Sequence, residues 1–157
     1  MKTLLSLFIF ILAMTGNNSC NIEGKGFKGH VFNKDHFVMI SIRDQASRYT
    51  PTNDDIIKAE ELLANNLEKI NKPLINQGGD CPIIHKKLKK YIRQYVGFIN
   101  KDGEKIIWIN FIWKDKVDKN KLSQDIYTIL DGCSYYWNIK VNLDKQELFD
   151  LNINGSA

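Results

Sequence analysis

The chain has 157 residues, of which 43% are hydrophobic, and its 22 Lys and Arg residues against 18 Asp and Glu residues give a formal net charge of +4. This length accommodates one domain with its own hydrophobic core. The positive excess is too small to indicate a nucleic-acid partner, because such proteins carry a strong basic patch.

The N-terminus predicts export. Lys2 supplies a positive charge, and the apolar run from Leu4 to Met14 follows it. This run has the length of a secretory signal and is too short to span a bilayer as a helix, which needs about 20 apolar residues. We therefore expect residues 1–19 to be a signal peptide and the protein to reside in the periplasm or at the outer membrane.

Cys20 follows the apolar run at the position of an acylated cysteine in bacterial lipoproteins. Ser19 suits cleavage before Cys20, whereas Asn17 stands where an aliphatic residue is usual, so secretion with an unmodified Cys20 is the alternative. Two or more acyl chains would hold the domain stably at a membrane. Residues 20–35 are rich in Gly, Lys and Asn and predict a flexible tether, followed by a single domain over 36–157.

One strand and one long helix are predicted next. Residues 37–42 are rich in β-branched and aromatic side chains, which favours a strand. Residues 52–71 carry apolar side chains at helical spacing, with Thr50 or Thr52 as the N-cap and Pro73 as the stop. This helix is the most clearly marked element of the chain.

Strands dominate the remainder. Alternating apolar and polar side chains, with a turn at 100–103 and another near 144–145, predict four strands, at 90–100, 105–113, 134–142 and 147–153. Residues 122–130 fit either a helix or a strand, and their β-branched content favours a strand. We expect an α+β fold in which one long helix packs on a curved antiparallel sheet of four to five strands.

Cys81 and Cys133 remain if Cys20 is acylated. Both follow turn-like residues, and export to an oxidising compartment favours a Cys81–Cys133 disulfide, with two buried thiols as the alternative. No Cys-x-x-Cys or His-x₃-His spacing is present, so we expect no metal. No cofactor-binding motif is present either.

Two segments resemble a family of small uncharacterised secreted lipoproteins of the Bacteroidetes. They are the helix start TPTNDDIIKAEELL and the tail DGCSYYWNIKVNLDKQELFDLNINGSA. The resemblance covers residues 50–157 and implies a fold similar to cystatin-like or NTF2-like proteins. It implies no catalytic residues. The Gln-x-Val-x-Gly segment of inhibitory cystatins is absent.

Basic and aromatic residues form the candidate binding surfaces. The proposed surface contains Lys86, Lys87, Lys89, Lys90, Arg93, Tyr95 and Tyr136. The lysines would suit an anionic surface, or would simply form a solvated strand entrance. A wider aromatic set would line a ligand cleft for sugars or peptides, or would pack in the core; its members are Tyr91, Tyr95, Trp108, Tyr135, Tyr136 and Trp137.

The sequence favours a non-catalytic binding module over an enzyme. Asp80, His85 and Asp131 are the only set that resembles acid–base machinery, and no nucleophile or phosphate-binding motif accompanies them. We expect a monomer anchored to the membrane by its N-terminal lipid, with an envelope protein, peptide or glycan as its ligand. The alternatives are a small enzyme with an NTF2-like pocket and a periplasmic accessory or immunity-type protein.

Overall fold

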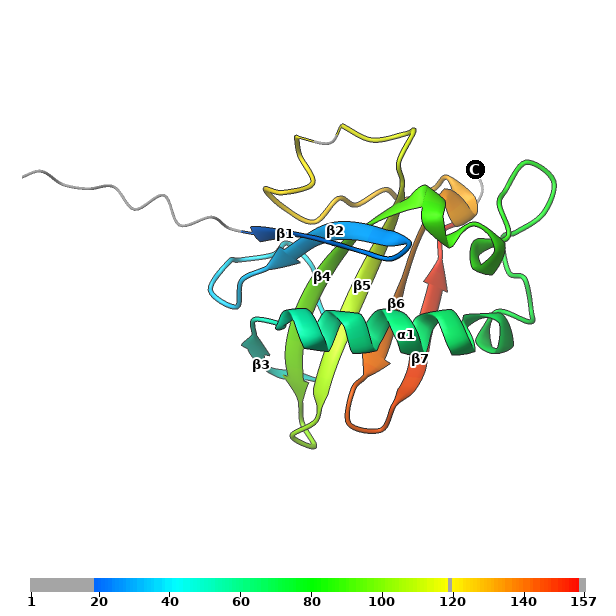
Figure 1. The fold of residues 1–157 in the computed structure, drawn as a ribbon. Helices are drawn as coiled ribbons and strands as arrows, with labels where there is room; N and C mark the ends of the chain where they lie inside the picture. Colours follow the sequence, from blue (N-terminus) through cyan, green and yellow to red (C-terminus); the bar gives the residue numbers. More distant parts are fainter. Residues whose placement is uncertain (1–18, 119, 156–157) are drawn as a thin grey trace, which may run out of the picture.

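The computed structural model describes residues 19–118 and 120–155 (Figure 1). In this part of the chain, helix α1 (Asn53–Ile70) lies across a seven-stranded, mostly antiparallel sheet. The α+β prediction is therefore confirmed, whereas the predicted count of four to five strands is too low. Three short 3₁₀ helices join the strands: η1 (Ile84–Lys86), η2 (Leu88–Lys90) and η3 (Cys133–Tyr135).

The strands are β1 (Ser19–Gly24), β2 (Phe27–Phe32), β3 (Gln45–Tyr49), β4 (Tyr91–Asn100), β5 (Lys105–Trp113), β6 (Tyr136–Asn142) and β7 (Glu147–Ile153). Their order in the sheet is β1-β2-β4-β5-β6-β7. The outer edge of β4 is shared: β2 pairs with its first half in parallel, and β3 pairs with its second half antiparallel. All other pairs are antiparallel.

Helix α1 starts at a capping box and matches the predicted helix at 52–71. Of the two candidate caps, Thr52 is used: its hydroxyl accepts from the Asp55 backbone N–H, and the Asp55 carboxylate accepts from the Thr52 N–H. Ile56, Ala59, Leu63 and Leu67 then form one buried stripe. This stripe faces the sheet because residues three and four apart share a helix face.

The main hydrophobic core lies between α1 and one face of the sheet. Alternation along the strands is as predicted, because Trp137, Ile139 and Val141 of β6 are all buried in this core. Gly97 of β4 lies where the chain passes from β3 to α1, and a Cβ there would meet the Tyr49 carbonyl oxygen at 2.7 Å. A glycine is therefore needed at this close approach.

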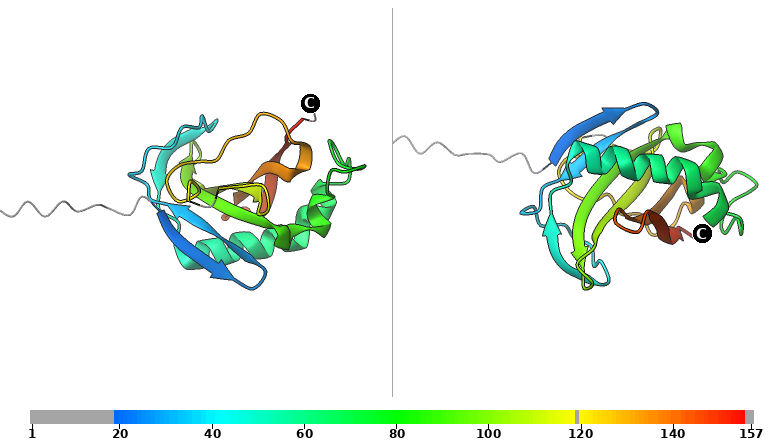
Figure 2. Two further views of the ribbon diagram at one scale, coloured as in Figure 1. Left: turned by 90° about the horizontal axis from the view of Figure 1, so that it is seen from above. Right: turned by 60° about the horizontal axis from the view of Figure 1, so that its bottom comes forward.

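The opposite face of the sheet is covered by two irregular segments, 33–44 and the described residues of 114–132, which are 114–118 and 120–132. In Figure 2 they lie on the side of the sheet away from α1. Apolar side chains from both pack on this outer face, in one small cluster around Phe32, Val38 and Val96 and in another around Ile92, Ile112 and Leu122.

The predicted tether at 20–35 is wrong. Its residues form the β1–β2 hairpin with a turn at Lys25 and Gly26, and β2 is part of the main sheet. Val31 and Phe32 are buried there. The apolar side chains, spaced between glycines and lysines, were too sparse to indicate a strand. The predicted signal peptide lies outside the described residues except for Ser19.

The predicted strand at 37–42 is also wrong. This stretch is irregular, and the strand forms later, as β3. The apolar character of the stretch nevertheless has a structural basis, because Val38, Ile40 and Ile42 pack against the sheet. The segment lies over the sheet face and pairs with no strand, since β2 and β3 already occupy the free edge of β4.

Residues 122–130 form neither a helix nor a strand. Side-chain amides, rather than the backbone of a neighbouring strand, form hydrogen bonds with the backbone of this segment. Gln94 donates from Nε2 to the carbonyl oxygens of Leu122 and Asp125, at 2.8 Å each, and its Oε1 accepts from the Tyr127 N–H at 2.9 Å. Buried backbone groups must be hydrogen-bonded, and a buried glutamine satisfies them as well as a neighbouring strand does.

The Cys81–Cys133 disulfide is confirmed, with the two Cα atoms 6.1 Å apart. It joins the loop after α1 to η3, which leads into β6. Disulfides persist in oxidising compartments, so this bond fits an exported protein. No helix in the described part of the chain is long and apolar enough to cross a membrane.

Candidate functional site

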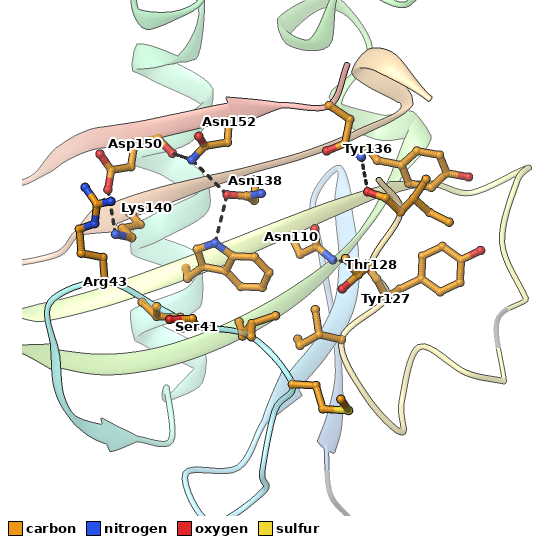
Figure 3. Close-up of a pocket in the computed structure, with 17 residues that line it drawn as sticks. Ser41, Arg43, Asn110, Tyr127, Thr128, Tyr136, Asn138, Lys140, Asp150 and Asn152 are labelled. Carbon is orange, nitrogen blue, oxygen red and sulfur yellow. Dashed lines mark hydrogen bonds and ion pairs between the residues drawn. The ribbon is translucent and has the colours of Figure 1, made fainter. Parts of the chain in front are cut away.

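A cleft of about 540 Å³ lies on the outer face of the sheet (Figure 3). Strands β5, β6 and β7 form its floor, and residues 39–43 and 126–129 form two of its walls. This volume is within the range of small-ligand sites. The rigid ladder below therefore presents a fixed set of side chains to a cavity open to solvent.

Three asparagines form a row across the floor. Asn110 of β5 pairs with Asn138 of β6, which pairs in turn with Asn152 of β7. All three side chains lie on the outer face because they occupy directly opposite positions in neighbouring strands. Figure 3 shows them side by side along the cleft. We call this set the asparagine row.

A second row contains Trp108, Lys140 and Asp150. Trp108 pairs with Lys140 in the ladder, and its indole Nε1 donates to Asn138 Oδ1 at 3.1 Å. Lys140 Nζ donates to Asp150 Oδ2 at 2.8 Å. The Lys140 side chain is mostly buried, whereas the Asp150 side chain is half-exposed. This ion pair stands at one end of the floor.

A β-bulge brings Asp150 into the cleft. The register between β6 and β7 shifts between Asn138 and Lys140, and Asp150 has a φ of +49°. Such a bulge redirects a side chain at the cost of local strain. Phe149, the ladder partner of Lys140, and Asp150 beside it consequently both contact the same lysine.

The floor retains hydrogen-bonding capacity after its internal bonds are counted. Within residues 19–118 and 120–155, Asn138 Nδ2 and Asn152 Oδ1 have no partner, because the bonds formed use Asn138 Oδ1 and Asn152 Nδ2. Asn110 donates to Gln94 and to the Tyr127 carbonyl, which leaves its Oδ1 without a described partner. The floor therefore offers both donors and acceptors to a ligand.

The charges of the cleft are nearly balanced. Lys140 is paired with Asp150, and the exposed Arg43 on the wall forms no ion pair with any residue the structure describes. Tyr136 closes the far end, where its hydroxyl donates to the Lys116 carbonyl at 3.2 Å. Partial burial raises the pKa of the Tyr136 phenol, helped by Tyr127 and Asp131, so this side chain is neutral at physiological pH.

Of the predicted binding surface, only Tyr136 lines this cleft. Four exposed lysines lie on η1, on η2 and between them, just before β4, and do not line the cleft: Lys86, Lys87, Lys89 and Lys90. Their role as a separate basic surface stays a prediction.

The inclusion of Arg93 and Tyr95 in that surface is wrong, because their exposed fractions are 1% and 0%. Both side chains point toward α1, where Arg93 Nε lies 3.3 Å from Glu60 Oε1 and the Tyr95 hydroxyl donates to the same oxygen at 2.9 Å. Positions 93 and 95 share one face of β4 because side chains alternate along a strand. Alternation does not show that α1 covers this face.

The aromatic set divides between the two faces of the sheet. Trp108 and Tyr136 line the cleft, whereas Tyr91, Tyr95 and Trp137 pack in the core under α1. Tyr135 lies elsewhere, with its ring edge-on to Trp113. Core packing is therefore confirmed for Tyr91, Tyr95 and Trp137, whereas ligand binding by Trp108 and Tyr136 stays a prediction.

The acid–base set is not assembled. His85 Nδ1 lies 2.9 Å from Asn71 Nδ2, and no hydrogen bond or ion pair between described residues joins it to Asp80 or Asp131. Among the residues the structure covers, no group of three His, Cys, Asp or Glu side chains could hold a metal ion.

Sequence reasoning missed the asparagine row and the Lys140–Asp150 pair. The signal was present, because Asn110, Asn138 and Asn152 occupy the polar positions of three consecutive predicted strands. Polar residues at these positions also suit a face that is simply open to water, so alternation alone did not single them out.

No protein-family model, curated protein or solved structure matches this chain. Its function therefore has to be inferred from the geometry of the chain itself.

Proposed function

We propose that this protein is a non-catalytic, envelope-anchored lipoprotein that binds its ligand in the cleft over β5, β6 and β7. The main observation in support is the asparagine row. It lies on the rigid floor of an open cavity of about 540 Å³ and has donors and acceptors without partners among the described residues. Ligand sites combine such a cavity with a few fixed polar groups. The helix on an antiparallel sheet also supports the proposed kinship with cystatin-like lipoproteins.

Three exposed apolar residues near the cleft favour a large ligand. Phe37, Met39 and Leu130 have exposed fractions of 80%, 75% and 94%, and they lie on the two covering segments. Exposed apolar side chains grouped around a depression mark interaction sites more often than isolated ones do. A partner that fills the cleft and also contacts these segments would bury them.

The alternative of a small enzyme with an NTF2-like pocket is supported by few residues in the cleft. Arg43, Lys140 and Asp150 are the charged side chains that line the cleft. A catalytic mechanism would have to use these three, and Lys140 is already paired with Asp150. The accessory or immunity-type alternative differs from our proposal only in the identity of the ligand.

Photocrosslinking tests the binding proposal. A benzophenone amino acid at Thr128, on the exposed cleft wall, should form a discrete adduct when the full chain is expressed in its envelope. The same group at Glu61, on the exposed side of α1, serves as the control. Identical adducts at both positions, or none at Thr128, would contradict the proposal.

Anchoring is tested separately at Cys20. This residue is exposed in β1, and the other two cysteines are joined in the disulfide. Cells grown with radiolabelled palmitate should label the wild-type chain, and Cys20→Ser should abolish the label and release the protein from membranes. Membrane retention of Cys20→Ser would count against a lipid anchor.

A further inference from the structure

We infer that the ligand of the cleft is a carbohydrate, bound through its hydroxyl groups by the asparagine row and through its ring by Trp108. This inference rests on the proposed binding function and names the class of ligand. It is argued from the chemistry of the floor, the position of the indole and the place of the cleft in the sheet.

The polar groups of the floor match hydroxyl groups. A sugar hydroxyl both donates and accepts, so it is satisfied best by donors and acceptors that stand close together. Asn138 Nδ2 supplies a donor, and the Oδ1 atoms of Asn110 and Asn152 supply acceptors on either side of it. The half-exposed Asp150 carboxylate adds an acceptor beside the Lys140 ammonium.

Trp108 offers an apolar surface in a fixed orientation. Its Nε1–H is bound to Asn138, so the ring cannot turn without breaking that hydrogen bond. The indole is half-buried and lies among the cleft-lining residues. A sugar ring has C–H groups on its faces and hydroxyls on its rim, which suits an aromatic side chain flanked by amides.

Other ligand classes fit the same geometry less well. A peptide bound by strand addition would pair with the free edge of β7, whereas the cleft lies on the face of β5, β6 and β7. A strongly anionic ligand would meet Arg43 alone, because Lys140 is already neutralised by Asp150. A purely apolar ligand would leave the asparagine row desolvated without partners, which is unfavourable for each group.

The test uses the full mature chain on a printed array of neutral and uronic-acid oligosaccharides, followed by titration calorimetry with the best binder. Asn138→Asp keeps the acceptor for Trp108 and replaces the free donor, and Asn152→Ala removes an exposed acceptor. Each should weaken binding by roughly tenfold, as expected for a lost hydrogen bond. Asn65→Asp and Asn65→Ala, on the exposed side of α1, should bind as wild type.

The outcomes separate the two proposals. Absence of binding to every sugar on the array, or binding that the Asn138 and Asn152 variants leave unchanged, would overturn the carbohydrate assignment. If a peptide array shows binding that depends on Asn152, the ligand class is wrong while the binding function stands. If Asn138→Asp fails to fold, as judged by circular dichroism, the exposed Asn152→Ala still decides the question.

Discussion

Glu60, Arg93 and Tyr95 show how a charged pair is accommodated inside this protein. The Arg93 guanidinium donates to both carboxylate oxygens of Glu60 at 3.3 Å and to the Tyr91 carbonyl at 2.8 Å, and it lies over the Phe111 ring. The charges are thus paired and hydrogen-bonded, which a buried ion pair requires. Removing only one of the two charges leaves the other buried without a partner, whereas removing both leaves no unpaired charge.

Glu60→Gln should lower the free energy of unfolding by about 3 kcal/mol, because it leaves the Arg93 charge buried without its counter-ion. Urea denaturation measures the change. The exposed neighbour Glu61→Gln is the matched control and should change stability little. Equal effects of the two substitutions would show that the buried pair contributes nothing.

Three tyrosines make the fold sensitive to alkali. Burial raises the pKa of Tyr49, Tyr91 and Tyr95 above 10.0, and the nearby Glu60 raises that of Tyr95 further. A raised pKa means that the folded state holds the proton longer than the unfolded state does. The contribution of these groups to stability is therefore complete below pH 10 and is lost as the pH rises beyond it.

In an absorbance titration, the signal of these three tyrosinates should appear together with unfolding, as followed by far-ultraviolet circular dichroism. Tyrosinate formation by all six tyrosines near pH 10 in a still-folded protein would contradict this assignment.

At the scale of the element, Gln94 is the side chain that makes the most hydrogen bonds to the backbone of the segment 122–127 among the described residues. Gln94 makes two hydrogen bonds from Nε2 and accepts two at Oε1, from Asn110 Nδ2 and the Tyr127 N–H. Gln94→Met keeps the volume and removes all four. We expect a loss of about 2–4 kcal/mol in stability, since several buried backbone groups lose their partners.

Hydrogen exchange at the Tyr127 amide provides the local readout and should be much faster in Gln94→Met. Gln124→Met, at an exposed position of the same segment, should leave this exchange rate unchanged. Slow exchange in both variants would mean that other contacts hold the segment in place.

The disulfide stabilises the connection between α1 and the floor of the cleft. Cys81 and Cys133 are separated by 52 residues, so their bond lowers the entropy of the unfolded chain and stabilises the fold by about 4 kcal/mol. Cys81→Ala with Cys133→Ala should show this loss in urea denaturation. Cys20→Ser should not, because Cys20 is exposed.

At the scale of the whole molecule, the β1–β2 hairpin is part of the domain. Deletion of residues 19–32 would uncover the edge of β4 and remove the buried Val31 and Phe32. We expect this truncated chain to be unfolded or aggregated by size-exclusion chromatography and circular dichroism. A folded, monomeric product would restore the interpretation of this segment as a tether.

The architecture could be predicted where periodicity and capping act locally. Helix α1, strands β4 to β7 and the burial of Trp137 all follow from the spacing of apolar residues. The covering segment around 122–127 could not be predicted, because its backbone is held by Gln94 and Asn110 from distant strands. The burial of Arg93 depends likewise on Glu60 of α1, which alternation along a strand cannot reveal.

Only some of the residues that line the cleft could be predicted from the sequence, because the others are brought together by strand pairing. Trp108 and Tyr136 were among the aromatic candidates, whereas the asparagine row exists only because three strands pair in one register. The bulge at Asp150 adds an element that no local pattern marks. A site built across strands is specified by pairing, and pairing is a property of the folded sheet.

The two sides of the cleft differ in what holds them. Backbone ladders join β5, β6 and β7, whereas the wall at 126–129 is attached by amide side chains, with Asn154 donating to the Ile129 carbonyl at 2.6 Å. Breaking a few such bonds requires less free energy than unzipping a central strand. We therefore expect the backbone amides of 126–129 to exchange with solvent faster than those of β5 and β6, so that one side of the cavity can adjust while the platform beneath it stays intact.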